Sequence, residues 1–174
     1  MFDMRTIPTK PWVNGAGTRQ ELAASTQDDT AWWLSVARID RDCPFSTYPG
    51  LARLHVIIAG KGTHLSGAGI DLEVAPLVPV SFDGDTPLDC RLRNGPCTAI
   101  NVIFDPARIR ANLAVLTAGV HEMSAREVAV FCVSGTVMAG GVTIQAGQGM
   151  VVQGASAMTV DPDARALCAR LDPA

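Results

Sequence analysis

The feature that most constrains the fold of this chain is a pattern of strands and turns that occurs twice. Residues Leu54–Gly84 and Val128–Gly154 each run through an apolar strand, a glycine turn, a short strand, a glycine-rich turn and further strands. Corresponding positions lie 70 to 75 residues apart, as Gly60 and Gly135 do. A repeat at a nearly constant offset indicates two related modules, and short, evenly spaced strands predict an all-β fold. We therefore expect two jelly-roll modules, the second with fewer polar residues.

Apolar runs between glycine and proline turns predict the strands of the first module. Residues 31–39 place Trp33, Ser35, Ala37 and Ile39 on one face, with apolar side chains and Arg38 on the opposite face. Such a strand is expected to be covered on both sides except at Arg38. Further strands are expected at residues 54–59, 63–65, 70–74, 78–82, 88–92 and 98–104.

Two segments fit either a helix or a strand. Asp105 and Pro106 are typical of a helix start, but residues 111–115 also alternate as a strand would. Because this segment joins two β modules, we expect a turn followed by a strand. The tail Ala166–Leu171 could close the second module as an edge strand or form a short helix.

Composition excludes several classes of protein. With 174 residues, 48% of them apolar, the chain can bury a proper core, and its formal net charge of −3 with no basic cluster argues against nucleic-acid binding. No apolar stretch is long enough to span a membrane, and the N-terminus lacks the core of a signal peptide. The five cysteines include no CxxC pair. We expect a cytoplasmic protein with reduced cysteines, no membrane contact and no nucleic acid partner.

The sequence contains no recognisable catalytic or metal-binding constellation. The three histidines, His55, His64 and His121, form no HxH pair, and no glutamate follows at the spacing that a metal site needs. There is also no GxSxG elbow and no strand–glycine loop–helix unit for a nucleotide. We therefore expect no metal and no cofactor.

Two segments carry a resemblance to a known family: PWVNGAGT at residues 11–18 and AWWLSVARIDRDCPFSTYPGLARLHVIIAGKG at residues 31–62. Together they resemble the HutD/Ves family, small bicupin proteins associated with histidine utilisation. The resemblance implies a double-stranded β-helix (RmlC-like jelly roll) in which two cupin modules are fused. It also implies a first module at residues 1–106, which holds the ligand pocket, and a second, reduced module at residues 107–174.

The chain departs from the family pattern in the spacing to Thr18, conservatively at Tyr48, which replaces a phenylalanine, and at three further positions. Ala16 stands where the family has a glycine, Cys43 replaces another glycine, and Leu34 stands where an arginine is usual. An anion donor at the position of Leu34 would therefore be lost unless Arg38 or Arg53 replaces it.

The first group of candidate binding residues comes from the two family motifs. Trp12, Asn14 and Thr18 belong to a short glycine-rich segment that forms either a structural turn or the mouth of a pocket. Ser35 lies on the strand that follows, and Ser46 lies in the loop CPFSTYPG. The aromatic residues of that loop, Phe45 and Tyr48, are expected to anchor it against the barrel.

The second group lies on two strands. Arg53 and His55 share one face of a half-buried strand, and Asn101 interrupts the apolar strand AINVIF with an amide that points into the barrel. A buried charge needs a partner, so Arg53 either pairs with Asp40 or Asp42 or holds a ligand carboxylate in a bidentate fork. The amide of Asn101 is satisfied by a structural network or by a ligand.

The function that the resemblance implies, and with which these residues are compatible, is binding of a small carboxylate metabolite of histidine degradation, of the urocanate or formyl/formiminoglutamate type, in a regulatory or buffering role. Such a protein would not be an enzyme. One alternative is a metal-independent isomerase or hydrolase with His55 as general base. Another is a regulator that binds a protein partner through an exposed edge strand. A homodimer is compatible with all three functions.

Overall fold

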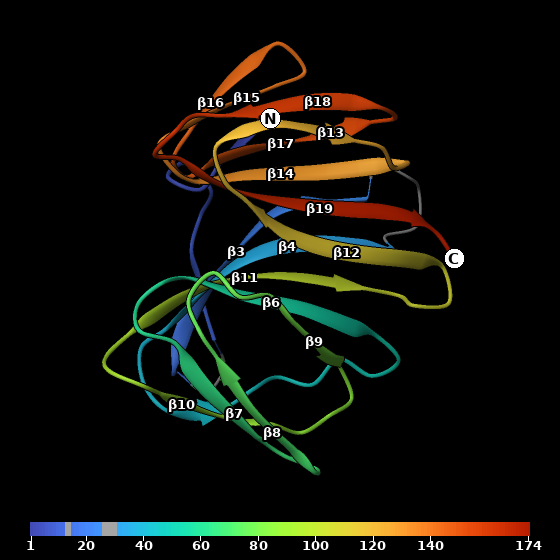
Figure 1. The fold of residues 1–174 in the computed structure, drawn as a ribbon. Coiled ribbons are helices and arrows are strands. Elements are labelled where there is room, and N and C mark those ends of the chain that lie inside the picture. The colour runs from blue at the N-terminus through green and yellow to red at the C-terminus, as the bar shows by residue number, and fades with distance from the viewer. Residues whose placement is uncertain (13–14, 26–30) are drawn as a thin grey trace.

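The structure, a computed structural model, describes residues 1–12, 15–25 and 31–174. The described residues form nineteen β-strands and no helix, as the strand-and-turn pattern predicts. No described helix could therefore cross a membrane. The strands build four sheets in two modules, with the second module above the first in Figure 1.

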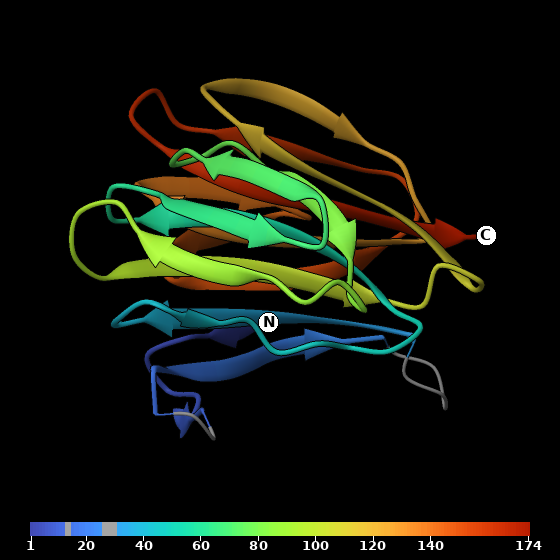
Figure 2. The same ribbon diagram turned by 90° about the horizontal axis from the view of Figure 1, so that it is seen from below.

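Two sheets form the first module. The six-stranded sheet has the order β2 (Lys10–Pro11), β3 (Gly17–Ala24), β4 (Trp32–Ile39), β11 (Cys97–Phe104), β6 (Ala52–Ala59) and β9 (Val80–Asp83). The four-stranded sheet has the order β5 (Cys43–Pro44), β10 (Asp89–Leu92), β7 (Thr63–Gly67) and β8 (Ile70–Val74). The view from below in Figure 2 shows these strands in front of the second module.

Two further sheets form the second module. The five-stranded sheet has the order β1 (Phe2–Asp3), β17 (Gln148–Gln153), β14 (Glu127–Ser134), β19 (Arg165–Pro173) and β12 (Ile109–Leu116). The four-stranded sheet has the order β13 (Gly119–Met123), β18 (Ser156–Val160), β15 (Thr136–Ala139) and β16 (Val142–Gln145). Neighbouring strands in all four sheets are antiparallel, as in jelly rolls.

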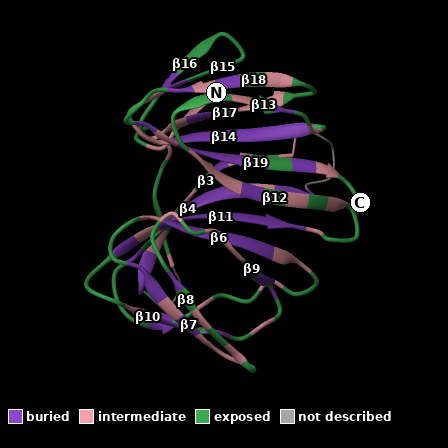
Figure 3. Ribbon diagram, viewed as in Figure 1, coloured by how far each residue is buried: buried purple, intermediate pink, exposed green. Residues whose placement is uncertain are grey.

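The central core lies between the six-stranded and the five-stranded sheets. Strand β4 contributes Trp32, Leu34 and Val36 to it, and β14 contributes Ala129 and Phe131. The opposite face of β4 looks into the first module, which explains why this strand is apolar on both sides. Figure 3 shows β4, β11 and β14 buried along most of their length. Leu34 therefore lies in the central core, on the face of β4 turned away from Ser35.

The segment between the modules has the expected structure, whereas the tail of the chain does not form the expected edge strand. A turn begins at Asp105, whose backbone carbonyl accepts hydrogen bonds from the amides of Arg108 and Ile109. Strand β12 follows this turn, so the predicted turn and strand are confirmed. The tail forms β19, but the expectation of an edge strand is wrong: β19 lies between β14 and β12. Its residues Ala166 to Ala169 are all buried, which a central position requires.

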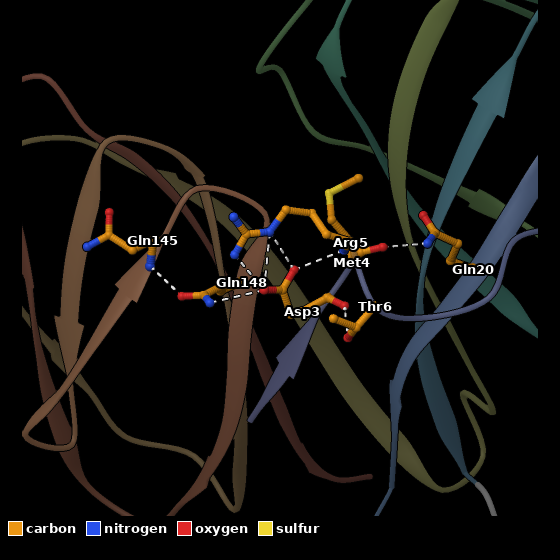
Figure 4. Close-up of polar contacts among 7 residues, drawn as sticks. All are labelled: Asp3, Met4, Arg5, Thr6, Gln20, Gln145 and Gln148. Atoms are coloured by element: carbon orange, nitrogen blue, oxygen red, sulfur yellow. Dashed lines mark hydrogen bonds and ion pairs between the residues drawn. The ribbon is translucent and has the colours of Figure 1, made fainter.

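The first residues of the chain connect the two modules. Strand β1 pairs with β17 of the second module, and the Gln148 side chain donates to the carboxylate of Asp3. On the other side, Nε2 of Gln20 on β3 donates to the carbonyls of Met4 and Ile7, at 2.6 Å each. Figure 4 shows Gln148 and Gln20 on opposite sides of this segment. The N-terminal segment, residues 1–7, therefore bonds to one strand from each module.

Candidate functional site

The first module contains a hollow between β4, β6, β11 and the loop that follows β5. The empty space in and in front of it, open solvent included, amounts to about 490 Å³. Six of the eight candidate residues line it: Trp12, Ser35, Ser46, Arg53, His55 and Asn101. The register explains three of them, because Asn101 on β11 lies opposite Ser35 on β4 and opposite His55 on β6. We call this hollow the Arg53 pocket.

Two candidate residues are not placed in the pocket. Thr18 lies on β3, where it pairs with Pro11 and Arg38, and it is not part of the lining. Asn14 lies outside the described residues.

The pocket also contains residues that the sequence did not single out as binding residues: Arg19, Ala37, Ile39, Phe45, Tyr48 and Ile103. Ala37 and Ile39 follow Ser35 on the same face of β4, so strand alternation could have found them. Arg19 comes from β3, a strand that the sequence reading did not predict. Phe45 and Tyr48 were expected to anchor their loop, and they also line the pocket beside Arg53.

Arg53 is buried, with 6% of its surface exposed, and has no carboxylate partner among the described residues. Of the two alternatives for Arg53, the pairing with Asp40 or Asp42 is wrong. Asp40 pairs with Arg38, and Asp42 accepts from the backbone amide of Leu92. Both aspartates are exposed, whereas the Arg53 side chain is buried inside the module. The two carboxylates therefore pair with groups near the surface and not with Arg53.

Aromatic rings and one carbonyl surround the Arg53 guanidinium instead. Its Cζ lies 4.8 Å from the ring centre of Tyr48, 5.3 Å from that of Phe45 and 5.4 Å from that of Phe82. Its Nη2 donates to the Ser46 carbonyl at 2.8 Å. Cation–π contacts of this kind partly replace lost hydration, but burial still lowers the pKa of Arg53 from its usual value.

His55 and Asn101 form a buried polar pair at the floor of the pocket. His55 Nδ1 lies 2.8 Å from the Asn101 amide oxygen, so Nδ1 carries the proton and donates. The ring packs edge-on against Phe45, with the ring centres 5.6 Å apart. Burial lowers the pKa of His55 to about 4, an effect that the charge of Arg53 adds to and the Asn101 hydrogen bond opposes. The imidazole is therefore neutral at pH 7.

The donor set does not fit a metal ion. Within the described part of the chain, no three His, Cys, Asp or Glu side chains come together as a metal site. His64 lies on β7 and pairs with Asp71, and His121 bonds to the Thr117 carbonyl, so neither joins His55. The pocket offers one imidazole beside a guanidinium, and a guanidinium cannot act as a ligand.

The second module has apolar side chains where the first has its polar ones. Strand β14 follows β6 by 75 positions, so Val128 and Val130 correspond to Arg53 and His55. Opposite Val130 on β19 lies Cys168, the counterpart of Asn101. Opposite Cys168 on β12 lies Ala114, the counterpart of Ser35. The polar cluster thus belongs to the first module.

Comparison with known proteins gives a family and a fold. The family model described as HutD matches residues 4–169. A relative from Pseudomonas putida, described as an uncharacterized 21.2 kDa protein in the hutC 3′ region, is 33% identical over 112 residues. That match spans 61% of this chain and 58% of the relative. Protein Ves of Citrobacter koseri is 28% identical over 152 residues, which cover 85% of this chain and 80% of Ves.

Solved structures agree with this result. HutD from Pseudomonas fluorescens SBW25 (formate condition) superposes with a TM-score of 0.88 at 27% identity, covering 99% of this chain and 97% of that one. A cupin 2 conserved barrel domain protein from Leptotrichia buccalis shares the fold, with a TM-score of 0.60 at 10% identity and coverage of 97% and 93%. The expected all-β cupin jelly roll is confirmed.

Proposed function

Since this chain belongs to the HutD family, we propose that it binds a small carboxylate metabolite of histidine degradation in the Arg53 pocket, without a metal. The candidate ligands are urocanate and formyl- or formiminoglutamate. We propose that binding serves a regulatory or buffering role in the cytoplasm rather than turnover.

The observation that carries the proposal is the buried guanidinium of Arg53, which has no carboxylate partner among the described residues. A buried charge is costly unless it is paired, and a ligand carboxylate would supply the missing countercharge. Guanidinium and carboxylate form two parallel hydrogen bonds, a geometry that favours this class of ligand. Polar groups in a partly apolar hollow are the usual composition of a small-molecule site.

One feature of His55 supports the enzyme alternative, and another argues against it. His55 has an orienting partner in Asn101, which the sequence did not show. However, its pKa of about 4 makes the neutral ring a weak base at pH 7, and efficient general bases have a pKa near the working pH. We therefore rank binding above catalysis.

The protein-binding alternative is favoured by strand β12. It is the outermost strand of its sheet, eight residues long, with Arg110 as its one charged residue. Its counterpart in the first module is β4, whose equivalent edge is occupied by β3. Long edges with little charge are suited to pairing with another strand. Pull-down of a partner without any metabolite, lost when Leu113 at the middle of β12 is replaced by proline, would favour this function.

A thermal-shift screen tests the proposed function. Purified protein is heated with urocanate, imidazolone propionate, formiminoglutamate or formylglutamate, each with and without a chelator. A ligand at 100 times its Kd adds about 2.7 kcal/mol, or about 5 to 11 °C in the midpoint for a chain of this size. We expect one carboxylate to give a shift that the chelator leaves unchanged.

Two arginine variants locate the site. Arg53→Met should abolish the shift, whereas Arg38→Met should retain it, because Arg38 is exposed and pairs with Asp40 outside the pocket. No shift with any of the four metabolites would contradict the proposed function.

A further inference from the structure

We propose that the Arg53 pocket selects carboxylates that also carry an N–H or O–H group, and that this group donates a hydrogen bond to Nε2 of His55. The inference rests on the proposed function, because it takes a carboxylate at Arg53 as its starting point. It adds a second recognition element and defines the ligand class by the chemistry of its donor.

The starting observation is a pair of unsatisfied polar atoms. Among the described residues, three buried side-chain nitrogen or oxygen atoms have no hydrogen-bond partner, and two of them, Arg53 Nε and His55 Nε2, belong to this pocket. Both residues lie on β6, two positions apart and therefore on one face of the strand. Buried polar groups are nearly always paired, so two unpaired neighbours in one hollow indicate that a ligand supplies their partners.

Asn101 decides which kind of partner His55 needs. Its amide oxygen accepts from Nδ1, which places the proton of the neutral ring on Nδ1 and leaves a lone pair on Nε2. Nε2 is therefore an acceptor, and it needs a donor from the ligand. Asn101 acts as a positioning residue, because it touches His55 and sets its tautomer.

The Phe45 ring covers both unpaired nitrogens. It packs against the His55 ring and also lies over the Arg53 guanidinium, at 5.6 and 5.3 Å between centres. Both unpaired nitrogens are sealed from solvent, whereas Phe45 itself is only partly buried. The buried Phe82 ring also lies beside both groups, so of these two rings Phe45 is the one nearer the surface, where a ligand would enter. A ligand that satisfies only Arg53 would leave Nε2 unpaired.

The test compares two ligands that differ in one group. N-formyl-L-glutamate carries an amide N–H, and 2-formyloxyglutarate has the same shape with an ester oxygen in its place. We expect isothermal titration to show the amide binding at least about tenfold more tightly, the effect of losing one hydrogen bond and leaving its acceptor unpaired.

Three variants assign this preference. His55→Phe keeps an aromatic ring but removes the acceptor, so the amide-to-ester ratio should fall to about one. Asn101→Leu should reduce the same ratio, and the nitrogen chemical shifts of His55 should then report a change of tautomer. His64→Phe is the matched control, since His64 lies outside the pocket, and it should leave both affinities unchanged.

The outcomes separate this inference from the proposed function. Equal affinity of amide and ester for the wild-type protein, or tighter binding of the ester, would overturn the donor requirement while carboxylate binding stands. A ratio that persists in His55→Phe would also overturn it. If neither compound nor any other carboxylate of the screen binds, the proposed function itself fails.

Discussion

Replacing Arg53 by methionine should make the ligand-free protein more stable while it abolishes ligand binding. The guanidinium gains one charge-assisted hydrogen bond, worth about 1.5–3 kcal/mol, and contacts with three rings. Against this stand a desolvation cost of several kcal/mol and an unpaired Nε that costs about 1–3 kcal/mol. Methionine has a similar length and packs well on aromatic rings. We expect Arg53→Met to raise the free energy of unfolding by about 1–2 kcal/mol.

Urea unfolding followed by tryptophan fluorescence measures this change, and repeating it with ligand reverses the order. At 100 times its Kd the ligand adds about 2.7 kcal/mol to the wild type and nothing to Arg53→Met, so the wild type becomes the more stable protein. Arg38→Met serves as control, because it removes an exposed arginine and should respond to ligand as the wild type does. A loss of more than about 3 kcal/mol in ligand-free Arg53→Met would refute the reasoning, since breaking a needed buried pair costs that much. Arg53 would then be a structural residue.

Three further predictions concern the pocket floor, the central core and the N-terminal segment. His55 has a pKa of about 4 in the folded protein against 6.5 for the free side chain, so the unfolded chain takes up its proton first as the pH falls. Lowering the pH from 7 to 5 should therefore reduce the free energy of unfolding of the wild type by about 2 kcal/mol more than that of His55→Phe. An equal loss in both proteins, measured by urea unfolding at the two pH values, would contradict this. Trp32→Phe should lower the free energy of unfolding by about 3 kcal/mol, because the fully buried indole donates to the Glu127 carboxylate at 2.7 Å between the modules. A fall of the thermal unfolding midpoint by less than about 3 °C would show that this hydrogen bond is dispensable. Gln20→Leu leaves two backbone carbonyls of the N-terminal segment without their donor and should speed amide hydrogen exchange in β1. Unchanged protection of the β1 amides would mean that the pairing of β1 with β17 is enough to hold this strand in place.

Local sequence patterns determined many of the strands, though not β3, and half of the residues that line the pocket. Alternation placed Arg53 with His55 on one side of β6 and turned Ser35 away from Leu34 on β4, and the structure agrees at both positions. The same rule placed Asn101 inside the barrel. These predictions succeed because a strand turns successive side chains to opposite faces, whatever its neighbours are.

Position within a sheet could not be obtained in this way. The tail fitted an edge strand or a short helix and became β19, an interior strand between β14 and β12, whereas β12 took the edge. Both strands are mainly apolar, and only the packing of the whole module decides which one has a neighbouring strand on each edge.

The sequence by itself thus determined the fold class, the family and six of the residues that line the hollow of the first module. Only the tertiary structure decided how those residues meet. It set Asn101 against His55 across 46 residues of chain, left Arg53 without Asp40 or Asp42, and placed Phe45 over both polar side chains. Periodicity is a property of neighbouring residues, but register and pairing depend on which distant strands and loops come together. The chemistry of this pocket depends on those long-range contacts.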